Sequence, residues 1–315
     1  MNNIAMVFPG QGSQKIGMLA NLAQAYNLVE KTFLEASNVL GYDLWKLVQE
    51  GPSVKLNTTY HTQPAILAAS FSIFKIWKEK SKKIPSLLAG HSLGEYSALV
   101  CAEVLNFSDA ITLVELRGKL MQEAVPEGIG SMQVIIGLDP QSIMKICQES
   151  SRDQIVSPVN YNSPDQIVIA GHKEAVDRAS LACKHSGAKL TLPLSVSVPA
   201  HCALMKPAAE KLSIALEKID FHSPIFPVIN NVDVVIETKP NAIRNALIRQ
   251  LDHPIQWIEI IKFIKKKGIT CLLEIGPGKT LTGLSKRTEP SLTLTAINDQ
   301  DSLEKALEVQ YEGGK

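Results

Sequence analysis

The chain of 315 residues carries 45% hydrophobic and 20% charged residues, a composition typical of a globular protein and too apolar for a disordered one. At about 150 residues per domain, this length predicts two domains, or one large domain with an insertion. The 32 Lys and Arg residues balance 31 Asp and Glu residues, so the net charge is +1 and the basic excess typical of nucleic-acid-binding proteins is missing. We therefore expect no nucleic-acid partner.

No apolar run in the sequence is long enough for a signal sequence or a membrane span. The run from Ile4 to Phe8 stops at Pro9, whereas a secretory signal needs about 7–15 apolar residues and a spanning helix about 20. The five cysteines are widely spaced without a C-x-x-C pair, which argues against a disulfide framework and a structural zinc site. We expect a cytoplasmic protein with reduced thiols, without a membrane partner and without a metal.

Both ends of the chain alternate short apolar runs with amphipathic stretches, which is typical of an α/β fold. The first part predicts strands over residues 4–8 and 84–89 and helices over 19–40, 95–102 and 108–124, with Gly41 ending the first helix and Ser108 or Asp109 capping the last. The last part predicts helices over residues 205–219 and 242–251 and strands over 228–232 and 270–275. Lys265, Lys266 and Lys267 are interpreted as a solvated helix end.

The middle of the chain has a different order of predicted elements. It predicts strands over residues 132–136, 155–159, 166–170 and 188–192 and helices over 140–149 and 174–185. Their order is βαββαβ, which is the ferredoxin-like unit. Turn residues flank this unit at Pro126 and Gly128 and again at Val198-Pro199. We therefore predict a large domain formed by residues 1–125 and 199–315, interrupted by a small domain of residues 126–198.

The strongest local signal is Gly90-His91-Ser92-Leu93-Gly94, which satisfies G-x-S-x-G between an apolar strand and a helix-forming stretch. In this pattern the serine occupies a strained strand-to-helix turn, and the flanking glycines remove side chains that would clash there. The turn exposes the serine hydroxyl at a helix N-terminus, where the next backbone N–H faces a developing oxyanion. The pattern favours Ser92 as a nucleophile over a simple helix-capping serine.

A serine nucleophile requires a base, and the chain has seven histidines. His201 is a candidate because it lies between small residues where the chain re-enters the large domain. A structural histidine would fit the same place, and the residues alone do not decide between these roles. No Asp lies shortly before His201, which argues against an ordinary lipase or esterase triad.

Arg117 falls inside the apolar stripe of the predicted helix over residues 108–124. A buried guanidinium needs an anionic partner, because a buried charge left without one costs on the order of 3–5 kcal/mol. That partner could be a distant carboxylate of the chain or the carboxylate of a substrate, for which arginine is better suited than lysine. The sequence leaves both alternatives open.

Two glycine-containing segments imitate nucleotide-binding loops and fail on specific residues. Residues 10–14 offer backbone donors for an oxyanion or a phosphate, but Lys15 stands where a dinucleotide fingerprint requires glycine. Gly278-Lys279-Thr280 imitates the end of a P-loop, but Leu273 replaces its first glycine. The sequence therefore predicts no nucleotide-binding motif at either place.

Taken together, several segments resemble malonyl-CoA:acyl-carrier-protein transacylases, the acyltransferases of bacterial type II fatty acid synthesis. The resemblance extends from Ile4 to about Arg287, and the combination of motifs is highly specific. The motifs are F-P-G-Q-G-S-Q (8–14), T-Q-P-A (62–65), G-H-S-L-G-E-Y (90–96), R-G (117–118), N-Y-N-S-P (160–164), V-P-A-H (198–201), N-N-V (230–232) and E-I-G-P-G (274–278).

The resemblance implies a large α/β-hydrolase-like domain with a ferredoxin-like insertion, in agreement with the predicted order of elements. It implies that malonyl-CoA acylates Ser92 and that the malonyl group then passes to the phosphopantetheine thiol of acyl carrier protein. It implies that His201 is the base and that backbone carbonyls near Gln250 orient it in place of an acid. It implies that the backbone N–H groups of Gln11 and Leu93 form the oxyanion hole. The substrate-binding residues that it implies are Arg117, Gln63, Met121 and Asn162.

With these roles, His201 takes the Ser92 proton and later protonates the departing CoA thiolate, which gives ping-pong kinetics. CoA thioester and carrier protein are substrates in this scheme, and no cofactor is implied. Because carrier proteins are acidic, we expect a basic rim at the mouth of the site, with Lys189, Lys286 and Arg287 as candidates. The oligomeric state is not readable from the sequence, and a monomer is the default expectation.

Two other functions use the same residues. A hydrolase would transfer the acyl group to water through the same serine and histidine, and the missing acid and the placement of Arg117 argue against it. A non-catalytic partner of carrier proteins would use the fold as a docking surface, but it would have no need for Ser92, His201 and Arg117 together. The segment Asp252-His253-Pro254 departs from the family pattern, which leaves the local surface open.

Overall fold

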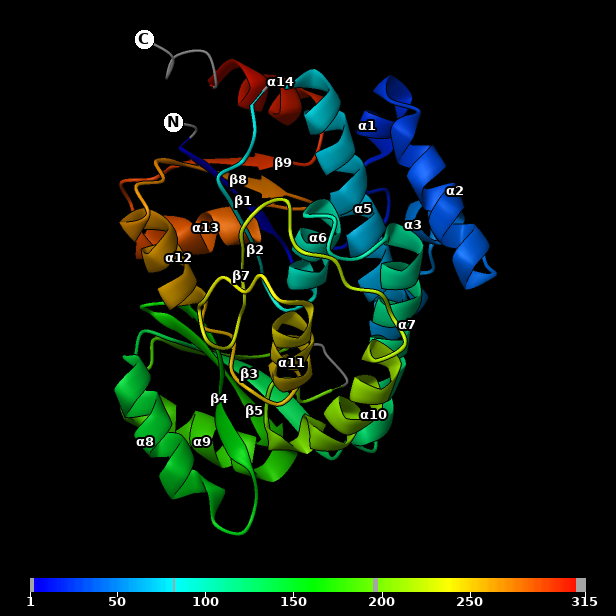
Figure 1. The fold of residues 1–315 in the computed structure, drawn as a ribbon. Coiled ribbons are helices and arrows are strands. Elements are labelled where there is room, and N and C mark those ends of the chain that lie inside the picture. Colours follow the sequence, from blue (N-terminus) through cyan, green and yellow to red (C-terminus); the bar gives the residue numbers. More distant parts are fainter. Residues whose placement is uncertain (1–2, 82, 195–197, 310–315) are drawn as a thin grey trace.

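The computed structural model describes residues 3–81, 83–194 and 198–309 and contains two β-sheets surrounded by helices (Figure 1). One sheet is parallel and one is antiparallel, so the predicted α/β class is confirmed. The strands are β1 (Ile4–Phe8), β2 (Leu87–Gly90), β3 (Gly130–Ile136), β4 (Val156–Ser163), β5 (Gln166–His172), β6 (Leu190–Pro193), β7 (Val228–Ile229), β8 (Cys271–Ile275) and β9 (Thr293–Ile297).

The helices lie on both faces of the parallel sheet and along the outer face of the antiparallel sheet (Figure 1). Within the described ranges, none of them combines the length and the apolar character needed to cross a membrane. They are α1 (Ala20–Ala25), α2 (Leu28–Leu40), α3 (Leu44–Glu50), α4 (Ser53–Leu56), α5 (Thr59–Lys80), α6 (Leu93–Cys101), α7 (Phe107–Ala124), α8 (Pro140–Ser151), α9 (Lys173–His185), the 3₁₀ turn η1 (Ala203–Met205), α10 (Lys206–Leu216), α11 (Pro240–Gln250), α12 (Trp257–Lys266), α13 (Thr280–Thr288) and α14 (Gln300–Val309).

The parallel sheet has the strand order β7-β2-β1-β8-β9 and places β1 near its middle. All five residues of β1 are buried, as expected for a parallel strand that is covered on both faces. Met6 and Phe8 point into the core that contains the apolar residues of α5 and α6, whereas Ala5 and Val7 point into the core formed with α12 and α13. The continuous apolar run in the sequence is therefore the signature of a doubly covered strand.

The antiparallel sheet has the order β4-β5-β3-β6, and its elements follow one another as βαββαβ, as predicted. Helices α8 and α9 cover its outer face with a core of its own (Figure 1). Its β4 is joined to the rest of the protein because Tyr161 N–H donates to Ile255 O at 3.0 Å and Ile255 N–H donates to Val159 O at 2.8 Å. The boundaries at residues 126 and 198 stay a prediction, since residues 195–197 lie outside the described ranges.

Several predicted elements have different limits in the structure. The single helix over residues 19–40 is wrong, because Tyr26 is extended and separates α1 from α2, although α2 does end at Gly41 in the left-handed conformation. The helix cap at Ser108 or Asp109 is also wrong. Asn106 caps α7 instead, because its side chain accepts the backbone N–H of Asp109 at 2.8 Å.

Two predicted strands are shorter than expected. The strand over residues 84–89 begins only at Leu87, and Ile84 is 60% exposed outside the sheet. The strand over residues 228–232 ends at Ile229, because the Asn230 side chain accepts the backbone N–H groups of Asp233 and Val234 and turns the chain. This turn places Asn231 beside the candidate nucleophile.

The largest difference lies between Gly41 and Ile84, where the sequence predicted no element and the structure contains α3, α4 and α5. The 22-residue α5 has most of its side chains buried on all sides and contains Pro64 in its interior. A helix without a polar face shows no apolar periodicity, which explains why the pattern missed it. Helices α12, α13 and α14 and strand β9 were likewise not predicted, apart from the lysine-rich end of α12, where Lys266 and Lys267 are exposed as expected.

The turn between β2 and α6 is too tight for a side chain at Gly90, and it packs against β1 too closely for one at Gly94. A Cβ atom on Gly94 would lie 1.9 Å from Phe8 O, and one on Gly90 would lie 1.8 Å from the carbonyl carbon of Gly94. Glycine is thus required at both places by close backbone approach, and this approach brings the loop after β1 beside Ser92.

We predict that Gly94→Ala destabilises the protein by on the order of 3 kcal/mol or more, because the new methyl group collides with the backbone of β1. Gly283→Ala is the matched control, because Gly283 lies within a helix and has open space around its Cα. This control is expected to raise stability by about 0.5–1 kcal/mol. Urea unfolding of both variants checks the prediction, and equal stability of the two would contradict the observed crossing.

Candidate active site

The candidate site lies at the carboxyl edge of the parallel sheet, where three strands end next to one another. Gln11 follows β1, Ser92 follows β2 and Asn231 follows β7. This edge is the usual position for ligands in open α/β sheets. Helix α7 contributes Arg117 and the end of α11 contributes Gln250.

Ser92 and His201, the predicted nucleophile and base, lie within hydrogen-bond distance of each other. The Ser92 Oγ atom lies 2.8 Å from His201 Nε2, and His201 Nδ1 lies 2.6 Å from the carbonyl oxygen of Gln250. Both residues have a positive φ, 53° for Ser92 and 65° for His201, which side chains other than glycine rarely adopt. Such strain persists where surrounding contacts impose it, and it is concentrated at functional sites.

The hydrogen bonds of His201 determine its tautomer. A carbonyl oxygen can only accept, so Nδ1 carries the proton and Nε2 presents a lone pair to the Ser92 hydroxyl. Burial and the nearby Arg117 charge lower the pKa of His201 to about 3, although the bond to Gln250 opposes this change. At neutral pH the imidazole is therefore uncharged and able to take a proton from Ser92.

Arg117 is completely buried, and its guanidinium faces the nucleophile. Its Nη2 donates to Ser92 Oγ at 3.2 Å and to Gln250 Oε1 at 2.9 Å, and its Nη1 donates to Gln63 Oε1 at 2.9 Å. The guanidinium carbon lies 5.3 Å from the centroid of the Tyr96 ring. Burial is the main cause of a lowered Arg117 pKa.

Among the residues that the structure describes, Arg117 has no carboxylate at ion-pair distance. All of its polar partners are neutral oxygen atoms, and its Nε has none. Of the two alternatives that the sequence left open, the intramolecular salt bridge is therefore not found within the described part of the chain. A buried guanidinium with neutral partners beside a nucleophile is suited to receive an anionic group of a ligand.

The other expected substrate-binding residues fall into two groups. Gln63 and Met121 belong to the Arg117 group, since Gln63 Nε2 lies 3.6 Å from Met121 Sδ and 3.4 Å from Gln11 Oε1. Asn162 lies apart from it, because its Oδ1 contacts His91 Nε2 at 2.8 Å. Asn162 lines a cavity of about 200 Å³ between the residue 10–13 loop, the antiparallel sheet and α13.

The two backbone N–H groups predicted to bind the oxyanion have the hydrogen-bonding state that this role requires. Among the described residues, the backbone N–H groups of Gln11 and Leu93 have no protein acceptor. Leu93 begins α6, so its N–H lies at a helix N-terminus beside Ser92. Glycine at position 10 allows the loop after β1 to lie close to the turn before Ser92, because a Cβ atom there would lie 2.6 Å from His91 O.

Two residues of the site were not predicted as functional from the sequence. Asn231 holds the strained turn, because its Oδ1 accepts Ser92 N–H at 2.7 Å and its Nδ2 donates to Gly90 O at 2.6 Å. Glu95 is buried on α6, and its Oε2 accepts Gln250 Nε2 at 2.7 Å. Both residues lie in motifs that carry the family resemblance, N-N-V (230–232) and G-H-S-L-G-E-Y (90–96), but the sequence assigned no role to either of them.

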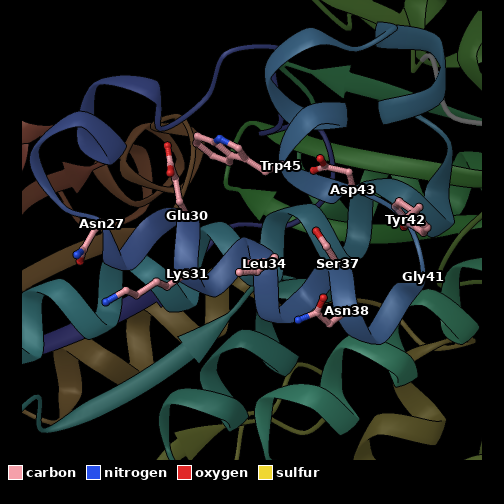
Figure 2. Close-up of a pocket in the computed structure, with 10 residues that line it drawn as sticks. All are labelled: Asn27, Glu30, Lys31, Leu34, Ser37, Asn38, Gly41, Tyr42, Asp43 and Trp45. Atoms are coloured by element: carbon pink, nitrogen blue, oxygen red, sulfur yellow. The ribbon is translucent and has the colours of Figure 1, made fainter.

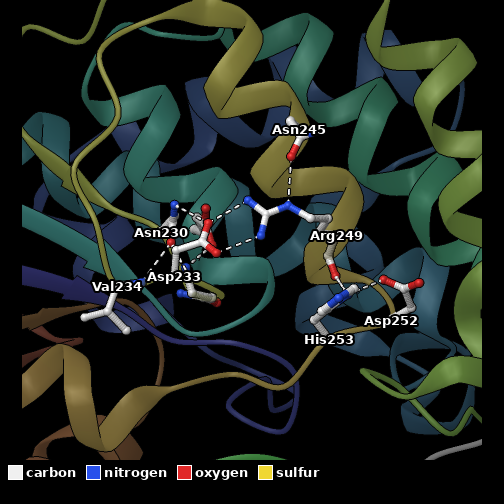
Figure 3. Close-up of polar contacts among 9 residues, drawn as sticks. Asn230, Asp233, Val234, Asn245, Arg249, Asp252 and His253 are labelled. Atoms are coloured by element: carbon white, nitrogen blue, oxygen red, sulfur yellow. Dashed lines mark hydrogen bonds and ion pairs between the residues drawn. The ribbon is translucent and has the colours of Figure 1, made fainter.

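An ion pair joins the two segments that carry Asn231 and Gln250 (Figure 3). Arg249 donates to both carboxylate oxygens of Asp233, at 2.7 and 2.6 Å, and to Asn245 Oδ1 at 2.8 Å. The bidentate pair lowers the pKa of Asp233 and raises that of Arg249. His253, in the segment that departs from the family pattern, contacts Arg249 O and Asp252 at the same surface (Figure 3).

The three candidate basic residues of the rim have different environments. Lys189 is exposed and packs against Gly137, and Lys286 donates to Pro290 O at 3.2 Å. Arg287 is engaged within the protein, because it donates to Ser163 Oγ at 3.2 Å and to Gln166 Oε1 at 2.8 Å. Arg287 therefore connects α13 to the turn between β4 and β5.

A larger hollow of about 750 Å³ lies on α2 and the segment that leads into α3 (Figure 2). Its lining includes Glu30, Lys31, Leu34 and Trp45 and none of the candidate site residues. Leu34 is 61% exposed there. The candidate site therefore lies outside this larger hollow.

Comparison with known proteins agrees with this geometry. Residues 5–303 match the acyl transferase domain family. The malonyl CoA-acyl carrier protein transacylase of Salmonella typhimurium is 60% identical over 98% of this chain and 99% of its own length, and that of Bacillus subtilis is 42% identical over 99% and 98%. The chain belongs to the malonyl CoA-acyl carrier protein transacylase family. The resemblance noted from the motifs is thus confirmed, and the protein is an acyltransferase.

Solved structures of the family have the same fold. A malonyl-transacylase in complex with its type II PKS acyl-carrier protein has a TM-score of 0.96 at 64% identity and covers 97% of this chain, with 99% of its own length matched. The acyl carrier protein S-malonyltransferase of Vibrio cholerae has a TM-score of 0.95 at 57% identity, with 97% and 100% covered. The arrangement of two sheets in this enzyme is therefore that of the family.

The buried Glu95 makes stability depend on pH. Burial raises the pKa of Glu95 from 4.5 to about 7, although bonds from Gln250 and Asn231 and the Arg117 charge oppose this change. Between these values the unfolded chain loses a proton that the folded protein retains, so folding becomes less favourable as the pH rises. Relative to the Glu95→Gln variant, the wild type is expected to lose about 3 kcal/mol of unfolding free energy between pH 4.5 and 8.

Denaturant unfolding of both proteins at several pH values measures this difference. The Glu95→Gln variant serves as the reference that removes the contributions of all other titrating groups. A difference in unfolding free energy that stays constant, or that grows in favour of the wild type with rising pH, would contradict a buried carboxyl with a raised pKa.

Proposed function

We propose that the enzyme transfers a malonyl group from malonyl-CoA to the phosphopantetheine thiol of acyl carrier protein through a malonyl-Ser92 intermediate. The names of its relatives, and the carrier-protein complex of a homologue, support both substrates. The product would supply the extender unit of fatty acid synthesis, which we place in the cytoplasm. The chemistry involves no metal and no cofactor, and we take the active unit to be a monomer.

The proposed first half-reaction uses the His201 lone pair. Nε2 takes the Ser92 proton while Oγ attacks the thioester carbonyl of malonyl-CoA, and the resulting oxyanion accepts from Gln11 and Leu93 N–H. When the tetrahedral intermediate collapses, the C–S bond breaks and the imidazolium returns its proton to the CoA thiolate. The carbonyl oxygen of Gln250 stabilises the imidazolium where other hydrolase-like enzymes use an acid.

The second half-reaction repeats these steps with a different thiol. The carrier thiol gives its proton to His201 and attacks the malonyl ester, and Ser92 leaves with that proton. The two substrates therefore use one site in turn, which is ping-pong kinetics. The cavity between the residue 10–13 loop and Asn162 is the space we assign to the thiol-bearing arm that both substrates share.

The observation that carries the proposal is the position of Arg117. Its Nη2 lies 3.2 Å from the nucleophile, and no carboxylate of the described residues pairs with it. The free carboxylate of a malonyl group bound to Ser92 would supply that charge partner. An acetyl group would leave the guanidinium unpaired, so the site should discriminate strongly between the two.

The direct test is the intact mass of the enzyme seconds after mixing with malonyl-CoA in the absence of carrier protein. We expect one malonyl adduct on the wild type and none on Ser92→Ala. Steady release of CoA without an adduct would instead show that water is the acceptor, and the hydrolase alternative would replace the proposal. No adduct and no CoA release would indicate a docking protein or a different acyl donor.

Arg117→Ala is expected to lower kcat/KM for malonyl-CoA by on the order of 10²–10³-fold, because a charge-assisted contact to the substrate carboxylate is lost. Acetyl-CoA makes no such contact, so its kcat/KM should change far less. Arg117→Lys retains the charge without the guanidinium fork, so its kcat/KM for malonyl-CoA should fall between those of the wild type and Arg117→Ala. Equal losses for malonyl-CoA and acetyl-CoA would exclude Arg117 as the carboxylate ligand.

A further inference from the structure

Glu95 is a buried carboxyl group next to the reactive residues that the proposed mechanism does not use. It lies in the first turn of α6, and 2% of its surface is exposed. Its Oε2 accepts Gln250 Nε2 at 2.7 Å and Asn231 N–H at 3.0 Å. A buried carboxylate is costly, and a well-packed neutral residue would avoid that cost.

The oxygen and the nitrogen of the Gln250 side-chain amide make opposite kinds of hydrogen bond. Its Oε1 accepts from Arg117 Nη2 at 2.9 Å. Its Nε2 donates to three oxygen atoms: Glu95 Oε2 at 2.7 Å, Ser92 O at 3.0 Å and Asn231 Oδ1 at 3.3 Å. Of these acceptors, Glu95 makes the shortest contact and is the one that can carry a charge.

A primary amide can rotate by half a turn and exchange its oxygen and nitrogen positions. In the reversed orientation, the Gln250 NH₂ group would face the NH₂ group of Arg117, and two donors would oppose each other. The Glu95 carboxylate prevents this reversal, because an oxygen of Gln250 in its place would meet an anionic oxygen. The orientation of the Gln250 oxygen toward Arg117 thus depends most on Glu95, because the other two acceptors of Nε2 are neutral and lie farther away.

We propose that Glu95 is a positioning residue that acts through the Gln250 amide to hold the Arg117 guanidinium in place for a carboxylate-bearing acyl group. Arg117 on α7 and Asp233 after β7 are the other charged groups that act on the Glu95 carboxyl. The inference rests on the proposed function, because it concerns how strongly the enzyme prefers malonyl over acetyl groups. Glu95 itself contacts neither Ser92 Oγ nor Arg117 in the free enzyme.

The test compares two substitutions of nearly equal volume at pH 8, where Glu95 is mostly ionised. Glu95→Gln retains an oxygen that can accept from Gln250, and Glu95→Met retains none. The measured quantity is the ratio of kcat/KM for malonyl-CoA to that for acetyl-CoA. This ratio does not depend on the concentration of active enzyme, so a partly folded variant still gives an answer. Glu95→Ala also lacks the thioether sulfur of methionine, which is a weak acceptor.

We expect Glu95→Met and Glu95→Ala to lower the malonyl-to-acetyl ratio at least about tenfold, and Glu95→Gln to keep it within about threefold of the wild type. The matched control is Glu274→Met. Glu274 is also a buried carboxyl, but it accepts the backbone N–H groups of Leu281 and Thr282 at the start of α13, away from Arg117. Its loss should reduce stability without changing the ratio.

An unchanged ratio in Glu95→Met, or a change of equal size in Glu274→Met, would overturn the positioning role and leave Glu95 a structural residue. Failure of the proposed function would look different, because the wild type itself would then form no malonyl adduct or show no preference for malonyl-CoA. The two hypotheses can therefore fail separately in the same set of assays.

Discussion

The burial of one positive charge is the constraint around which this active site is built. Arg117 is fully enclosed, and its neutral oxygen partners come from α5, from the turn before α6 and from α11. Neutral oxygens satisfy the donors of a guanidinium but do not neutralise its charge, and the low dielectric of the interior strengthens its attraction for an anion. Burial and this charge together lower the pKa of His201, so Arg117 also helps to keep the imidazole uncharged.

Backbone strain at the two reactive residues is the second feature of the site. Ser92 and His201 both have a positive φ, and each is fixed by hydrogen bonds from neighbouring elements. Asn231 binds both sides of the serine turn, and His201 N–H donates to Leu251 O at 3.0 Å. The segment after β7 and the end of α11 therefore hold the geometry of both residues, and the Arg249–Asp233 ion pair joins these two segments at the surface.

The antiparallel sheet completes the site without contributing to the reactive pair. Through Asn162 it contacts His91, and through the backbone of β4 it is hydrogen-bonded to Ile255, which follows α11. Arg287 adds a contact from α13 to the turn between β4 and β5. The cavity of about 200 Å³ lies between these contacts, so its shape depends on how the two sheets are held together.

The sequence alone determined the features that depend on neighbouring residues. The strand Ile4–Phe8, the G-x-S-x-G turn and the βαββαβ order follow from local patterns, and Arg117 was recognised as buried from its place in an apolar stripe. Tertiary structure decided what depends on distant residues. Of the seven histidines, it brought His201, the base that the resemblance implies, into contact with Ser92 and with the Gln250 carbonyl, and it showed that Arg117 has no carboxylate partner among the described residues. Helix α5 escaped prediction because burial on all sides removes apolar periodicity. The link from Glu95 to Gln250 escaped prediction because a hydrogen bond between residues 155 positions apart leaves no local pattern in the sequence.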